Sequence, residues 1–90
     1  MHREAGLRRF GITVQDWDRM FTEQGGVCAI CRQPETYMQN GRFKRLSVDH
    51  HHTSNHVRGL LCSECNTAIG LMHDNPDRLR AAAAFVSEGV

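Results

Sequence analysis

The four cysteines of this 90-residue chain are the feature that most limits what it can fold into. They form two CxxC pairs, Cys28 with Cys31 and Cys62 with Cys65, separated by thirty residues. Hydrophobic residues make up 40% of the chain and aromatic residues 7%, which leaves a thin core for a domain of this length. Small domains usually supplement such a core with disulfides or a metal. We therefore expect a single domain over residues 1–90, stapled through its cysteines.

Four thiolates at this spacing favour one structural Zn²⁺ ion, bound tetrahedrally by the two CxxC pairs. The alternatives are two disulfides or a redox-active CxxC. Disulfides suit exported proteins, whereas the chain has neither an apolar signal segment nor an apolar run that would span a membrane. A redox site needs a single CxxC at a helix start after a parallel strand. We expect a soluble, cytoplasmic protein whose zinc is closed to water, so that any catalysis takes place elsewhere.

The residue pattern predicts a small α+β fold in which helices flank a β-hairpin. Thr13 and Asp16 form a capping-box signature, Asn40 with Gly41 is typical of a tight turn, and Asn75 before Pro76 indicates a helix start. The expected elements are a helix over 14–24, the first CxxC turn, strands over 43–50 and 57–61, a helix over 62–72 and a last helix that begins at residue 76.

Asp49 lies between the cysteine pairs, ahead of three histidines, and Asn66 directly follows the last cysteine. Carboxylate and amide oxygens suit Mg²⁺ or Mn²⁺, and histidine is the side chain that most often serves as a general base near neutral pH. These types match hydrolysis of a phosphodiester, in which water is deprotonated while charge develops on the departing 3′ oxygen. The alternative is an exposed histidine tract or a second zinc site. Neighbouring strand residues face opposite ways, so Asp49 and His50 share a site only if the strand is distorted there.

The net charge of +1 excludes binding of polyanions through the overall charge of the chain. Any contact with DNA must therefore come from a local group of basic residues. Residues 27–58 are the basic segment, and ten of the eleven basic residues of the chain are arginines, which suit bidentate phosphate contacts. The alternative is a solvated basic face, and for Arg58 a buried ion pair. The candidate DNA-binding residues are Arg42, Lys44, Arg45 and Arg58.

The segment LSVDHHHTSNHVRGLLCSECNTAIG, preceded by EQGGVCAICRQP, resembles the recombination endonuclease VII family, a zinc-stapled branch of the HNH nucleases best known from bacteriophages. The resemblance covers about residues 10–86 and implies a ββα-metal (HNH) fold with flanking helices. It implies that Asp49 and Asn66 bind the catalytic Mg²⁺ or Mn²⁺ and that His50 is the general base. It also implies that His52 holds phosphate or orients the site, and that the four cysteines bind structural zinc. His73 is a candidate for the last histidine of the HNH pattern, or a surface histidine at a helix end.

Three departures from the family pattern favour nicking over resolution of DNA junctions. His51 replaces an acidic residue, Ile69 replaces a carboxylate, and the sequence stops at Val90, before the helices with which junction-resolving members form dimers. We expect an endonuclease with little sequence specificity, a monomer or weak dimer, encoded by a phage or prophage and acting in the host cell. The alternatives are a catalytically silent zinc module that binds nucleic acid, or the nuclease subunit of a phage packaging or recombination complex.

Overall fold

The computed structural model describes residues 3–51 and 53–89. Over these residues the chain forms four helices and two separate two-stranded antiparallel sheets. The helices are α1 (Arg3–Arg8), α2 (Val14–Glu23), α3 (Ser63–Leu71) and α4 (Pro76–Glu88), and the strands are β1 (Met38–Gln39), β2 (Arg42–Phe43), β3 (Ser47–His50) and β4 (Val57–Leu61). The expected small α+β architecture is confirmed.

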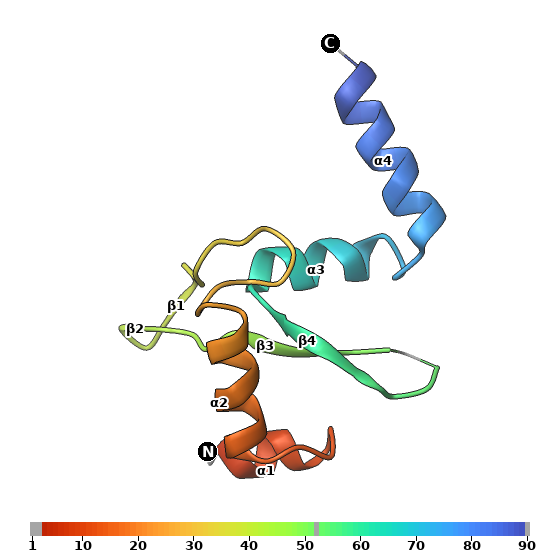
Figure 1. The fold of residues 1–90 in the computed structure, drawn as a ribbon. Coiled ribbons are helices and arrows are strands. Elements are labelled where there is room, and N and C mark those ends of the chain that lie inside the picture. The colour runs from red at the N-terminus through yellow and green to blue at the C-terminus, as the bar shows by residue number, and fades with distance from the viewer. Residues whose placement is uncertain (1–2, 52, 90) are drawn as a thin grey trace.

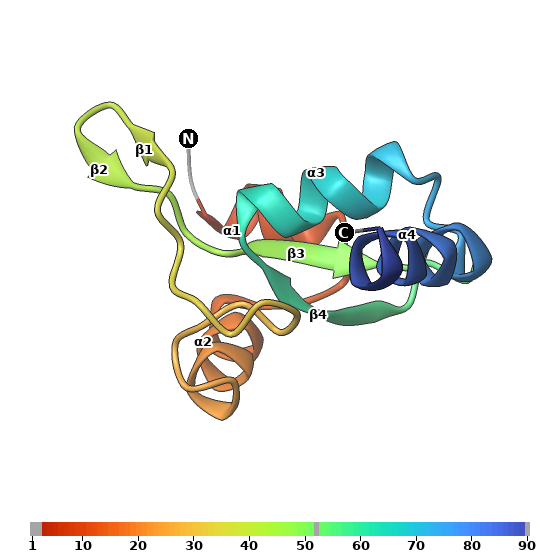
Figure 2. The same ribbon diagram turned by 90° about the horizontal axis from the view of Figure 1, so that it is seen from above.

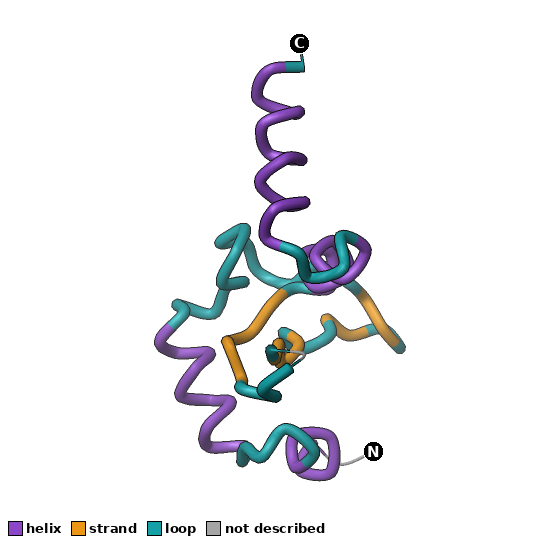
Figure 3. The backbone as a smooth tube through the Cα atoms, turned by 90° about the vertical axis from the view of Figure 1, so that its right-hand side faces the viewer, coloured by secondary structure: helices purple, strands orange, loops and turns teal. Residues whose placement is uncertain are grey.

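The β3–β4 hairpin is the centre of the fold. Helix α3 lies along one side of it, and α1 and α2 lie on the other side (Figures 1 and 3). The last helix, α4, extends away from this body. The second hairpin, β1–β2, stands apart from the central one (Figure 2). Helix α3 contacts β3, so that Asp49 of β3 and Asn66 in the first half of α3 belong to neighbouring elements.

Local capping signals explain where the helices begin. The side chain of Thr13 accepts a hydrogen bond from the Asp16 N–H at 3.1 Å, and the Asp16 carboxylate accepts one from the Thr13 N–H at 2.9 Å. This reciprocal pair satisfies two backbone donors at the start of α2. Asn75 caps α4 by accepting a hydrogen bond from the Arg78 N–H at 3.0 Å. Both helix starts expected from the sequence are confirmed.

The strand expected over residues 43–50 is wrong in its first half. Arg42–Phe43 belongs instead to the small hairpin, whose turn residues Asn40 and Gly41 have φ angles of 53° and 77°. Two successive positive φ angles suit the tight hairpin turn that the Asn-Gly pair predicts. The expected order also lacked α1 and β1, because neither short segment has a periodic pattern of its own.

Burial of Leu46 explains why the chain leaves the sheet between β2 and β3. Leu46 is only 3% exposed, and its carbonyl accepts a hydrogen bond from the Trp17 indole N–H at 3.2 Å. The Trp17 ring stacks on Phe21 with centroids 5.0 Å apart. The backbone therefore turns inward at Leu46 to fill the space beneath α2. The buried apolar core is small and consists of Leu7, Trp17, Cys28, Leu46, Leu60, Leu61 and Cys62.

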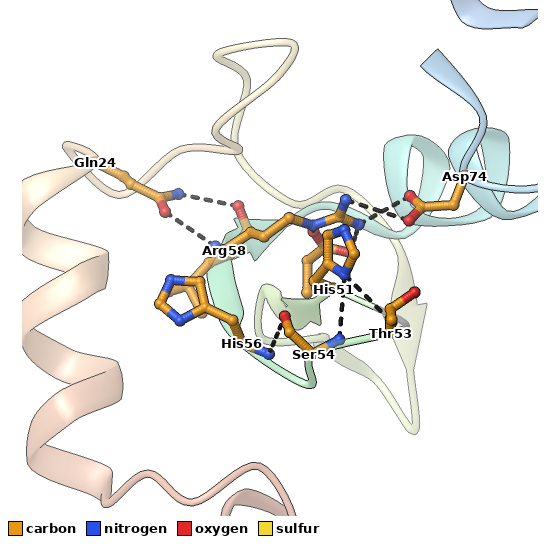
Figure 4. A network of polar contacts seen from close by, with 9 residues as sticks. Gln24, His51, Thr53, Ser54, His56, Arg58 and Asp74 are labelled. Carbon is orange, nitrogen blue, oxygen red and sulfur yellow. Dashed lines mark hydrogen bonds and ion pairs between the residues drawn. The ribbon is translucent and has the colours of Figure 1, made fainter. Parts of the chain in front are cut away.

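A side-chain amide continues the sheet where no further strand is present. The Gln24 side chain accepts a hydrogen bond from the Leu60 N–H at 3.0 Å and donates one to the Leu60 carbonyl at 3.0 Å (Figure 4). The Ala29 N–H also donates to the Leu60 carbonyl, at 3.1 Å. These bonds tie the end of α2 and the first CxxC turn to β4, so the two cysteine pairs are brought together.

Candidate metal centre and candidate active-site groove

The four cysteines meet in space although thirty residues separate the two pairs. One ligand atom from each lies within 4.8 Å of the others, and the Cys31 and Cys62 sulfurs are 3.8 Å apart. Four sulfurs about 2.3 Å from a zinc ion stand about 3.8 Å apart at tetrahedral angles. No disulfide joins any of the four cysteines, and the four-sulfur cluster favours one metal ion over the disulfide alternative. The cluster is positioned to bind one metal ion and is compatible with structural zinc.

The electrostatics of the thiols also suit a cation. Burial opposes ionisation of Cys28, but backbone N–H groups of Cys62, Cys31 and Ile30 outweigh it and lower the Cys28 pKa to about 6. At Cys65, burial and then the neighbouring sulfurs raise the pKa above its usual range. One thiolate therefore forms readily and opposes ionisation of the others. A divalent cation would relieve this repulsion, which is why the donor set fits zinc.

The second cysteine pair is built into the start of α3. Cys62 is the N-cap residue, and its sulfur accepts a hydrogen bond from the Cys65 N–H at 3.4 Å. Glu35, which follows the first pair, accepts hydrogen bonds from the Ser63 N–H at 3.0 Å and from the Ser63 hydroxyl at 2.6 Å. These hydrogen bonds fix the start of α3, and with it the position of Asn66 one residue beyond Cys65.

A groove of about 810 Å³ is lined by residues of α1, β2, β3 and α3, and none of the four cysteines is among its described lining residues. Asp49, His50 and Asn66 all line it, and among its described lining residues Asp49 is the sole carboxylate. The cations that line it come from the segment after α1 and from the chain around β2; they are Arg9, Arg42, Lys44 and Arg45. Four cations around one carboxylate make this groove attractive to a polyanion.

The central hairpin contains a bulge next to Asp49 and His50, which both line the groove. Asp49 pairs with Gly59, but His50 pairs with Val57, so Arg58 is an extra residue in β4. The expected distortion at this point is therefore present, and it lies in the partner strand. His50 also packs against Phe10, with ring centroids 5.2 Å apart, which holds the imidazole at the edge of the groove.

The extra residue, Arg58, binds two carboxylates. Its guanidinium donates to the two Asp49 oxygens at 2.6 and 3.0 Å, and to the two Asp74 oxygens at 2.9 and 3.3 Å (Figure 4). The side chain of Asp49 is only 11% exposed, against 34% for Arg58. Of the two readings of Arg58, the structure shows the ion pair. Both carboxylates raise the pKa of Arg58 above its usual range.

Replacing Arg58 by methionine is expected to destabilise the fold by about 2–4 kcal/mol. Methionine keeps the apolar stem but leaves the Asp49 carboxylate buried without its cation, and removing one partner of a buried pair is strongly unfavourable. Arg80→Met is the matched control, because Arg80 pairs with Asp77 on an exposed surface, where ion pairs contribute little. Urea unfolding of both variants with zinc present measures the difference. Equal losses in the two variants would contradict the role assigned to Arg58.

The remaining candidate residues fall in different places. Arg58 lies outside the described lining of the 810 Å³ groove, and so does His73, which is exposed in the turn after α3. His52 lies outside the described residues. His51 shapes the hairpin loop, because its Nδ1 atom accepts hydrogen bonds from the N–H groups of Thr53 and Ser54 at 3.2 and 3.3 Å (Figure 4).

Sequence reasoning missed three residues near the site. Asp74 holds Arg58, Phe10 packs on His50, and Arg9 adds a cation to the groove. Arg9 and Phe10 are adjacent in the sequence but about forty residues from His50. No local spacing indicates such contacts, because they depend on how α1 packs against the central hairpin.

The fold and the site together define a small α+β domain with a basic groove and four cysteines that could bind a metal ion, a class that includes nucleases and nucleic-acid-binding modules. Comparison with known families is more specific. The family model of recombination endonuclease VII matches residues 3–88, so the chain belongs to this family, as the sequence motifs indicated. Family membership implies a nuclease domain.

Two curated relatives are phage proteins, both named Gene 59 protein. The protein from Mycobacterium phage D29 is 41% identical over 81 residues, which cover 89% of this chain and 46% of that protein. The protein from Mycobacterium phage L5 is 47% identical over 60 residues, which cover 67% of this chain and 34% of that protein. The chain thus spans less than half the length of these relatives. No solved structure matches the chain.

Within the described residues, no helix has the length and apolar character needed to cross a lipid bilayer.

Proposed function

We propose that this chain is a metal-dependent HNH endonuclease that hydrolyses phosphodiester bonds in DNA. The observation that carries the proposal is that Asp49, His50 and Asn66 line a single groove together with four cations. The order of elements supports it, since the β3–β4 hairpin leads directly into α3, as in a ββα-metal unit. Membership in the endonuclease VII family supports a nuclease of this kind.

The proposed reaction is attack of water on a phosphodiester phosphorus. His50 removes a proton from the attacking water, the new bond forms between that oxygen and phosphorus, and the bond from phosphorus to the 3′ oxygen breaks. The cations of the groove hold the DNA backbone and orient the phosphate. His52 is proposed to hold the phosphate beside His50.

Asp49 and Asn66 are proposed to bind the catalytic ion. The Asp49 carboxylate has about four lone-pair positions, and two of them accept hydrogen bonds from Arg58, so two remain for a metal. The Asn66 amide oxygen is a second hard donor in the same groove. When bound, Mg²⁺ or Mn²⁺ would stabilise the negative charge on the departing 3′ oxygen.

The proposed substrate is DNA that is bound through its phosphates, so we expect little sequence preference. Each binding event is proposed to cut one strand and leave a nick. We propose that the domain acts in a phage-infected host cell, as a monomer or weak dimer. The relatives are phage proteins, which supports action in a phage-infected cell.

Conversion of supercoiled plasmid to open circles with Mg²⁺ or Mn²⁺ tests this function. We expect wild-type protein to nick and Asn66→Ala to lose at least about tenfold in rate, because one of the two proposed ligands is removed. Thr67→Ala is the matched control, since Thr67 is the next residue of α3, is exposed and lies outside the groove lining. Absence of nicking by wild type, or equal nicking by all three proteins, would overturn the proposal.

The second candidate function is a DNA-binding module without catalysis. The bidentate bond from Arg58 to Asp49 favours it, because the guanidinium places a positive charge beside the proposed ion. Fluorescence anisotropy with labelled DNA, run beside the plasmid assay, separates the two functions. Binding without nicking at any concentration of Mg²⁺ or Mn²⁺ would support the module.

A further inference from the structure

The β1–β2 hairpin exposes large apolar side chains to solvent. Phe43 is 68% exposed, Tyr37 54% and Met38 50%. Met38 and Phe43 are directly opposite each other in the register, so they share one face of the hairpin. The hairpin stands away from the β3–β4 sheet (Figure 2). Grouped apolar side chains with polar neighbours mark a surface that binds a partner.

The charges beside these side chains indicate what the partner is. Arg42 precedes Phe43, and Lys44 and Arg45 follow it. The Lys44 ammonium donates to the Ser47 hydroxyl at 3.1 Å, which holds it near the start of β3. Cations interleaved with an aromatic ring suit single-stranded nucleic acid, because the cations bind phosphates while the ring stacks on a base.

The hairpin is continuous with the candidate active site. Phe43, Arg42 and Arg45 line the same 810 Å³ groove as His50 and Asn66. A DNA strand that follows the groove therefore passes both the Phe43 ring and the proposed catalytic residues. The Phe43 ring is therefore placed to contact the DNA strand that is cut.

We propose that Phe43 is a base-stacking platform and that the groove takes a single-stranded stretch of DNA, with one unstacked base against the Phe43 ring. This inference rests on the proposed nuclease function and names the form of DNA it acts on. In a duplex each base is already stacked on its neighbours, and displacing one is unfavourable. Phe43 therefore contributes to single-strand binding and not to duplex binding.

Anisotropy titrations with a labelled oligothymidine and with a duplex of equal length test the inference, without added Mg²⁺ or Mn²⁺ so that no DNA is cut. We expect Phe43→Ala to raise the Kd for the single strand about tenfold, since stacking on an aromatic ring contributes roughly 1–3 kcal/mol per base. The duplex Kd should change less than about twofold, and the salt dependence should stay the same because no phosphate contact is lost. Phe43→Tyr should restore binding.

Phe85→Ala is the matched control, because Phe85 is 77% exposed but lies on the projecting helix α4. A single-strand loss in Phe43→Ala that is no larger than in Phe85→Ala would overturn the inference. So would an equal loss on single strand and duplex. The plasmid assay reports separately on the nuclease. If wild-type protein nicks plasmid but Phe43→Ala binds the single strand as tightly as wild type does, only the platform is rejected.

Discussion

Removal of the metal from the four-cysteine centre is expected to unfold this domain. Two of the seven buried core residues in the described part of the chain, Cys28 and Cys62, are themselves proposed ligands, and the rest of this core is too small to replace them. Zinc binding contributes about 10–16 kcal/mol in zinc-finger peptides, whereas whole domains are stable by only about 5–15 kcal/mol. Circular dichroism and metal analysis should show one zinc per chain and loss of the cooperative melt after chelation.

Cys31→Ser separates the loss of a ligand from the loss of core packing, because Cys31 is exposed whereas Cys28 is fully buried. We expect Cys31→Ser to lower zinc affinity strongly and to melt at least about 15 °C below wild type, since a loss of a few kcal/mol shifts the Tm of a small domain by that much. As a control, wild-type protein that has been treated with chelator should refold when zinc is added and should not refold when Mg²⁺ is added. A cooperative melt that persists without metal would contradict the staple.

Loss of the imidazole at residue 50 is expected to reduce plasmid nicking by about 10²–10⁴-fold, the usual contribution of a general base. His50 lines the groove that Asp49 also lines, and its ring packs on Phe10. His50→Ala should therefore slow the reaction while DNA binding changes little, because the phosphate contacts come from the cations. Single-turnover nicking rates and anisotropy on the same preparation measure the two quantities.

His56→Ala is the matched control for His50→Ala. His56 is an exposed residue of the same hairpin, near the loop, and lies outside the described lining of the groove. We expect its variant to nick at the wild-type rate. If both variants slow the reaction equally, or if neither does, His50 is not the general base. If His50→Ala instead abolishes DNA binding, its role is in substrate contact.

Helix boundaries were predictable because their causes are local. The Thr13–Asp16 capping pair and Asn75 with Pro76 act within one turn, so the short sequence patterns contain the whole signal. The path between β2 and β3 was not predictable in the same way. It depends on Leu46 fitting beneath Trp17, which is 29 residues away in the sequence.

The candidate site shows the same division. The residue types of Asp49, His50 and Asn66 indicated phosphodiester chemistry, and strand alternation indicated that a distortion was needed between the first two. The distortion is an extra residue in the opposite strand, Arg58, which is held by Asp74. No local sequence pattern predicts this arrangement. Side-chain partners at this separation are chosen by the packing of α3 against the central hairpin.

The amino-acid sequence by itself determined the four cysteines that could bind a metal, the starts of α2 and α4, the Asn-Gly hairpin turn and the family, because each depends on residue type at short spacing. Only the tertiary structure decided that the basic segment around β2, the cation of Arg9 and the Asp49 strand line one groove. It also decided that Arg58 binds carboxylates rather than standing free on the surface. The reason is physical: burial and ion pairing depend on which distant surfaces meet, and that is settled when the two cysteine pairs close around one centre.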